Sequence, residues 1–245
     1  MPATLKTDAI VLRSIRYGEA DRVLHLYTPA HGRLSAIAKG SRRAHSRFGG
    51  RLEPFFRLTT ILHEGRSELR TVTSAATLAG HPRLREHAGS LDAAARACDA
   101  VGRLFETEDP HPGVYHLLAN ELALLDDDPA GATLSNQLAF RLKLLLAAGL
   151  APALDACASC GEQADLVAFS PAAGGIVCGA CEAASFALDP AAYSFMVGAL
   201  GASLAAAPAA PMRALRQVER AITELAEHHA QVRLRAAGSV LSAPG

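Results

Sequence analysis

The spacing of hydrophobic residues changes near residue 80, and this change limits the possible folds more than any other feature of the chain. Before Gly80, short apolar runs alternate with turn residues, a pattern typical of β-strands. After Gly80, apolar residues recur every three or four positions, as they do in amphipathic helices. We therefore expect an α+β, multidomain chain, with a strand domain over residues 1–80 and a helical domain over residues 81–245.

The first 80 residues contain five short apolar runs. They lie at residues 8–12, 23–27, 34–38, 55–62 and 68–72, with glycine-bearing turns between them. Five short strands in so few residues predict a small β-barrel. An OB-type barrel is favoured because that fold also has a nucleic-acid-binding face, although the pattern alone leaves an SH3-like barrel open.

Helical spacing appears at residues 91–105, 115–125 and 134–150, and again from Pro211 onward. In the last segment, apolar positions follow steps of three and four: Leu215, Val218, Ile222, Leu225, His229 and Val232. This stripe predicts a long helix packed on a bundle, with His229 as a core histidine rather than a ligand. Cys98 stands alone in an expected helix, which favours a buried, inert thiol.

The formal net charge of zero hides two opposed parts. Residues 1–85 hold 15 Lys and Arg against 6 Asp and Glu, whereas residues 86–245 hold 9 against 18. A basic part joined to an acidic part suggests a polyanion bound on one side and protein partners on the other. Nucleic acid is the expected polyanion.

The basic charge is concentrated between Arg22 and Leu52, which hold seven Lys and Arg and no carboxylate. A solvated loop would usually mix signs, so we expect this stretch to bind phosphates without reading base sequence. The expected DNA-binding residues are Arg33, Lys39, Arg42, Arg43, Arg47 and Arg51. Tryptophan is absent, so any base-stacking surface would depend on scarce aromatics such as Tyr17, Tyr27 and Phe48.

Four of the five cysteines form two Cys-x-x-Cys pairs. They are Cys157, Cys160, Cys178 and Cys181, with 17 residues between the pairs. Two such pairs can supply the four corners of a tetrahedral zinc site, and four thiolates leave no open position for catalysis. We expect one structural Zn²⁺ per chain, in a module at about residues 155–185. Residues 166–169 and 175–177 could pair as the hairpin of a zinc ribbon.

Several functional classes find no support. The sequence has no phosphate-binding Gly-Lys-Ser/Thr loop, dinucleotide fingerprint, His-Glu-x-x-His motif or nucleophile elbow, so an enzyme is not predicted. The longest apolar run, near residues 138–150, is interrupted by Arg141 and Lys143 and is too short to span a bilayer. No signal peptide follows Met1. We expect a cytoplasmic, nucleoid-associated protein that does not bind membranes.

Three runs of residues resemble the RecO family of bacterial recombination mediators. They are residues 17–22 (YGEADR) with 27–32 (YTPAHG), residues 38–43 (AKGSRR), and residues 46–55 (SRFGGRLEPF). The likeness is specific over the first quarter of the chain. The cysteine pairs and the terminal helix extend it across nearly the whole length.

The resemblance implies an N-terminal OB-fold, a helical C-terminal domain and, in many members, a zinc module. It implies that the protein binds single- and double-stranded DNA and anneals complementary strands. With RecR, and often RecF, it would load RecA onto DNA coated by single-strand-binding protein, whose C-terminal tail contacts the helical domain. Arg141 is a candidate for that contact. Two alternatives stay open: a non-enzymatic adaptor that docks acidic proteins, and a zinc-ribbon RNA-binding factor.

Overall fold

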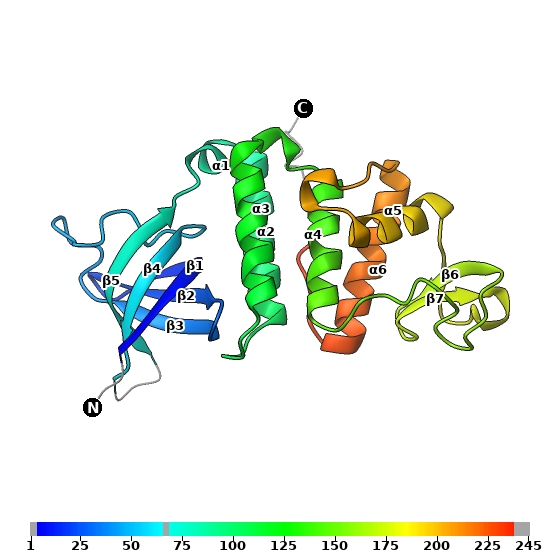
Figure 1. Ribbon diagram of the computed structural model, residues 1–245, viewed down its shortest axis with the longest axis horizontal. Coiled ribbons are helices and arrows are strands. Elements are labelled where there is room, and N and C mark those ends of the chain that lie inside the picture. Colours follow the sequence, from blue (N-terminus) through cyan, green and yellow to red (C-terminus); the bar gives the residue numbers. More distant parts are fainter. Residues whose placement is uncertain (1–3, 66–68, 238–245) are drawn as a thin grey trace. The chain divides into compact units, whose positions relative to one another are not determined.

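The chain divides after Pro129 into two units, one holding residues 1–129 and the other residues 130–245. The computed structural model describes residues 4–65 and 69–237 (Figure 1). None of the helices in these ranges is long and apolar enough to cross a membrane. The change from strands to helices falls at Ala79, inside the first unit. The predicted division into domains of residues 1–80 and 81–245 stays a prediction.

The first unit begins with a closed five-stranded barrel. Its strands are β1 (Thr4–Tyr17), β2 (Asp21–Thr28), β3 (Gly32–Ala38), β4 (Arg57–His63) and β5 (Arg70–Ala79). They close in the order β1-β2-β3-β5-β4, and only the β3–β5 pair is parallel. This arrangement confirms the predicted OB-type barrel and gives no support to the SH3-like alternative.

Strand β1 closes the barrel because it pairs with two neighbours in turn. From Thr4 to Ile10 it pairs with β4, and from Ile10 to Tyr17 it pairs with β2. A register shift between Val11 and Arg13 marks a β-bulge, which bends the strand between its two partners. Alternate residues of the strands point inward and form the barrel core, as the period of two predicts.

The segment between β3 and β4, residues 39–56, contains turns and no regular helix or strand. Phe48 and Leu52 point inward from it and are each 2% exposed, as part of the barrel core. Burying two such side chains contributes a few kcal/mol to the stability of the unit. The loop is therefore anchored at its middle, although half of its residues are exposed.

Three helices complete the first unit: α1 (Pro82–Glu86), α2 (Ala88–Leu104) and α3 (Pro112–Asp127). Helix α2 buries mainly small residues, including Cys98, which is 3% exposed as expected. Burial raises the pKa of the Cys98 thiol far above its usual value, so this thiol is inert. Phe105, just after α2, packs edge-on against Tyr27 of β2 with ring centroids 6.3 Å apart.

Over its described residues, 130–237, the second unit combines three helices with a small sheet. The helices are α4 (Leu134–Ala147), α5 (Pro190–Gly201) and α6 (Met212–Ala230). The strands are β6 (Leu166–Ser170), β7 (Gly175–Cys178) and β8 (Phe186–Ala187), in the order β7-β6-β8. Short 3-10 turns occupy Gly179–Cys181 and Leu204–Ala206, and a third, Pro129–Gly131, lies at the boundary of the two units. The β6–β7 pair confirms the predicted hairpin.

The predicted stripe on the last helix is confirmed in its first part only. Leu215, Val218, Ile222 and Leu225 are buried, but α6 ends at Ala230. The prediction that His229 is a core histidine is wrong, because this residue is exposed and its Nε2 lies 2.8 Å from the carbonyl oxygen of Pro171. In the last turn of α6, residues 227–229 are all exposed, so the stripe is not covered there.

Candidate nucleic-acid interface and metal centre

The loop of residues 39–51, hereafter the basic loop, brings five of the six expected DNA-binding residues together. All five are exposed: Lys39, Arg42, Arg43, Arg47 and Arg51. Among the ion pairs of residues 4–65 and 69–237, none involves any of these five side chains. Their charges are therefore available to an external anion.

Backbone contacts fix the start of the basic loop against the β1–β2 turn. The backbone N–H of Arg42 donates to the carbonyl oxygen of Ala20 at 2.8 Å, and its Nη1 donates to that of Gly18 at 3.3 Å. The backbone N–H of Gly40 donates to Oδ1 of Asp21 at 2.7 Å. Gly40 has a φ of 65°, which favours glycine. These hydrogen bonds hold the start of the basic loop next to the β1–β2 turn.

The second half of the basic loop is held by its own backbone and by an aromatic ring. The guanidinium of Arg47 lies 4.9 Å from the centroid of the Phe48 ring. Nη1 of Arg51 donates to the carbonyl oxygens of Arg47 and Phe48, at 3.3 and 3.4 Å. These contacts orient both cations without neutralising them.

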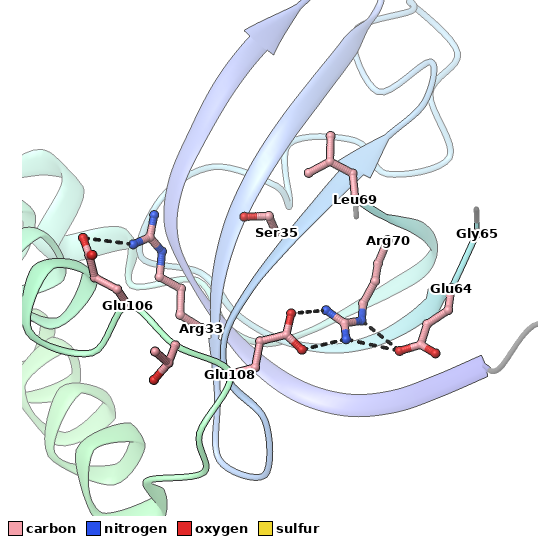
Figure 2. A pocket seen from close by; sticks show the side chains of 9 residues that line it. Arg33, Ser35, Glu64, Gly65, Leu69, Arg70, Glu106 and Glu108 are labelled. Atoms are coloured by element: carbon pink, nitrogen blue, oxygen red, sulfur yellow. Dashed lines mark hydrogen bonds and ion pairs between the residues drawn. The ribbon is translucent and has the colours of Figure 1, made fainter. Parts of the chain in front are cut away.

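Arg33, the sixth expected residue, lies apart from the loop on β3. Its Nη1 donates to the carbonyl oxygen of Gly102 at 2.9 Å and lies 3.7 Å from Oε1 of Glu106 (Figure 2). The backbone N–H of Arg33 also donates to Thr107, at 3.0 Å. A binding role for Arg33 stays a prediction, and the described contacts hold this side chain against the end of α2 and the segment that follows it.

Arg33 lines a pocket of about 960 Å³ whose cations are matched by carboxylates. Arg70 donates to both carboxylate oxygens of Glu108 at 2.7 and 2.8 Å, and it also contacts Glu64 at 3.2 Å (Figure 2). The hydrogen bond from Arg70 lowers the pKa of Glu108 and raises that of Arg70 in return. The basic loop therefore offers an anion more uncompensated charge than this pocket does.

Sequence reasoning missed two cations on β1. Arg13 and Arg16 are exposed, but they precede the stretch without carboxylates and so escaped notice. The register places Arg13 opposite His25 of β2. Burial, followed by the charges of Arg33 and Arg13, lowers the pKa of His25. Arg13 therefore adds an exposed cation beside His25 on the outer face of β1 and β2.

The aromatic residues expected to stack on bases fall into two groups. Tyr27 is fully buried and Phe48 is 2% exposed, so neither can meet a ligand. Tyr17, at the end of β1, is 57% exposed. Their burial could not be assigned from sequence, because all three lie beside polar or glycine residues.

The four paired cysteines converge in the second unit. The sulfur atoms of Cys157, Cys160, Cys178 and Cys181 all lie within 4.8 Å of one another. The Cys160 and Cys178 sulfurs are 3.7 Å apart, close to the ~3.8 Å edge of a tetrahedron with Zn–S bonds of about 2.3 Å. The geometry and the soft donor set fit a closed four-thiolate metal site.

Hydrogen bonds around the cysteines shift the pKa values of their thiols in opposite directions. The N–H of Gly161 donates to the carbonyl oxygen of Cys157 at 2.8 Å, and Gly161 adopts a φ of 81°. The pKa of Cys157 is lowered to about 6, and the largest cause is a backbone hydrogen bond from Cys178. The pKa of Cys181 is raised to about 12, and the largest cause is its hydrogen bond with the Cys160 side chain. A divalent cation among the sulfurs would favour deprotonation of all four.

Arg141, the expected partner-binding residue, lies in the interior of α4. It is 3% exposed, and its Nη2 donates to the carbonyl oxygen of Arg235. This contact links α4 to the backbone at Arg235, near the end of the described residues. A partner contact at Arg141 stays a prediction.

Comparison with known proteins gives matches over nearly the whole chain. The family model "Recombination protein O N terminal" matches residues 1–81, and "Recombination protein O C terminal" matches residues 90–237. The chain is 37% identical to a protein named DNA repair protein RecO from Rubrobacter xylanophilus, covering 99% of this chain and 97% of the relative. It is 36% identical to the protein of that name from Anaeromyxobacter dehalogenans, covering 95% and 94%.

Proposed function

Since this chain belongs to the RecO family of DNA repair proteins, we propose that it binds single- and double-stranded DNA and anneals complementary strands. The observation that carries the proposal is the basic loop, whose five exposed cations lack carboxylate partners among the described residues. We place the expected DNA contacts at these five residues. Arg33 is a weaker sixth candidate, because Glu106 already lies beside it.

Annealing follows from charge neutralisation. Two complementary strands repel each other through their phosphates, and a cationic loop that binds one backbone reduces the charge the second strand meets. The contacts of the loop are to phosphates and leave base edges exposed, so pairing between strands can proceed. This role needs no nucleotide hydrolysis, and we propose a mediator rather than an enzyme.

We propose that the four cysteines hold one structural Zn²⁺. With four thiolate ligands the metal has no open coordination position, so it would cross-link β7 and the turns around it. Bound zinc would supply folding energy to this module, whose strands are 5, 4 and 2 residues long.

Membership of the family supports a set of protein partners. We propose that the chain acts with RecR, and with RecF where present, to load RecA onto DNA coated by single-strand-binding protein. We also propose that the C-terminal tail of that coat protein is bound by the helical part of the chain. Such a protein would work at the nucleoid in the cytoplasm.

Charge reversal in the basic loop tests the DNA-binding proposal. Five cations on single-stranded phosphates give a slope of about −3.5 for log K against log salt, and removing two contacts reduces it to about −2.1. We expect Arg42→Glu with Arg43→Glu to show the shallower slope, weaker binding and slower annealing. Fluorescence anisotropy and strand-annealing assays measure these quantities.

The matched control reverses the same charge elsewhere. Arg216→Glu with Arg233→Glu changes two exposed arginines of the second unit. This control should keep the steep slope, and both doubles should keep the metal content of the unaltered chain. An annealing rate unchanged by the loop substitutions would refute the proposal.

A further inference from the structure

The outer face of strands β1, β2 and β3 carries a row of apolar side chains. Ile15 of β1 lies directly opposite Val23 of β2, and Val23 lies opposite Ile37 of β3. Side chains paired in this way have Cβ atoms about 4.5–5.5 Å apart, so the three form one continuous surface. Ile15 is 41% exposed, and Val23 and Ile37 are half-buried. We call these three residues the apolar row.

Tyr17 extends the apolar row at its β1 end. It lies two residues after Ile15, and alternate residues of a strand share one face. With 57% of its surface exposed, its ring is open to a flat partner. Of the three aromatics that the sequence suggested for stacking, Tyr17 alone is exposed.

The basic loop is attached beside this ring. Gly18, the neighbour of Tyr17, accepts a hydrogen bond from the Arg42 side chain at 3.3 Å. Ala20, in the same turn, accepts from the Arg42 backbone at 2.8 Å. The hydrogen bonds to this turn therefore hold the basic loop, with its unpaired cations, next to the turn that follows Tyr17.

A polar row lies on the other side of the apolar row. Arg13, His25 and Ser35 are paired across the same three strands, and Nδ1 of His25 lies 3.2 Å from Oγ of Ser35. Arg13 is exposed. The apolar row is thus bordered by positive charge both at Arg13 and at the basic loop.

We propose that the bases of single-stranded DNA stack on Tyr17 and lie along the apolar row, while its phosphates contact the basic loop. This rests on the proposed DNA-binding function and specifies its ligand. Apolar side chains bordered by cations match a strand with an anionic backbone and exposed π-faces. Duplex DNA does not match them, because its bases are already stacked on one another.

The test compares Tyr17→Ala with Tyr17→Phe, which keeps the aromatic ring. Loss of one base–aromatic stack corresponds to roughly 5- to 150-fold weaker binding of a single-stranded oligonucleotide. We expect that loss for Tyr17→Ala and less than about a twofold change for Tyr17→Phe. Leu78→Ala, which changes an exposed apolar residue on β5, serves as the control and should have no effect.

An oligonucleotide of abasic sites separates stacking from charge. It keeps the phosphates and removes the bases, so Tyr17→Ala should bind it as well as the unaltered chain does. The salt slope for the ordinary strand should also be unchanged, and duplex affinity should shift less than twofold. Equal losses on the ordinary and abasic strands, or no loss on either, would overturn the inference.

The two proposals fail in different ways. If the unaltered chain binds no DNA, the proposed function itself is wrong. If it binds DNA with the expected salt slope and Tyr17→Ala binds the ordinary strand equally well, then only stacking on this face is wrong.

Discussion

The arginines of the barrel show how far a single residue's role can be read from sequence. The exposure of the five loop cations follows from a stretch that lacks carboxylates and is rich in glycine. The position of Arg33 does not follow from it, because its partner Glu106 lies 73 residues further along the chain. Contacts of that kind depend on tertiary packing, which local patterns do not encode.

His81 provides a pH-dependent test at the scale of one residue. It is 6% exposed and has a φ of 50°, and burial is the leading cause that lowers its pKa below 6.5. The unfolded chain therefore binds a proton more readily than the folded one, and stability declines as pH falls below 6.5. Asparagine tolerates this backbone conformation, so His81→Asn should make the decline of stability with falling pH shallower.

Urea unfolding between pH 7.5 and 5 measures this effect. As pH falls, the unfolding free energy of the unaltered chain should decrease more than that of His81→Asn. His45→Asn, in the exposed basic loop, is the control. A difference that stays constant with pH would show that His81 protonation does not contribute.

At the scale of whole elements, hydrophobic spacing predicted most of the fold. The five strands, four of the helices and the metal-site hairpin all lie where the period placed them, with shifted ends. Helix α5 escaped prediction because its twelve residues include no charged side chain and so show no polar face. The anchoring of the basic loop also escaped, since Phe48 and Leu52 follow no regular period.

The anchor of the basic loop predicts a large stability loss from one truncation. Phe48→Ala removes a buried ring from the barrel core and should cost about 3–5 kcal/mol of unfolding free energy. Arg47→Ala, the neighbouring change, removes only an exposed cation over that ring and should cost less than about 1 kcal/mol. Thermal or urea unfolding distinguishes them, and similar costs would mean that Phe48 does not anchor the loop.

Across the whole molecule, the charge is balanced within each unit rather than between them. Residues 1–85 carry 15 Lys and Arg against 6 Asp and Glu, and residues 86–129 of the same unit carry 2 against 10. The acidic counterpart of the barrel therefore lies largely in its own helices. Sequence alone placed the basic part correctly but could not show that the compensating part belongs to the same compact unit.

The chain forms two compact units, and we expect each of them to unfold as its own cooperative transition. We expect calorimetry to resolve two transitions, of which a zinc chelator lowers only the one belonging to residues 130–245. Cys178→Ser should reproduce the chelator's effect, because three remaining sulfurs cannot complete the site. Cys98→Ser, which alters the first unit, should leave one metal per chain. A chelator that shifts both transitions equally would contradict separate unfolding.

Among the described residues, β3 and β5 pair at two positions, Ala36 with Arg70 and Ile37 with Thr71, and these pairs close the barrel. Arg70 joins three parts of the chain there, through Glu64 after β4 and Glu108 before α3. If β3 and β5 separate here, the ion pair between Arg70 and Glu108 is strained, and the α2–α3 connection moves with it. A molecule that binds the α2–α3 connection would therefore change the free energy of opening the barrel.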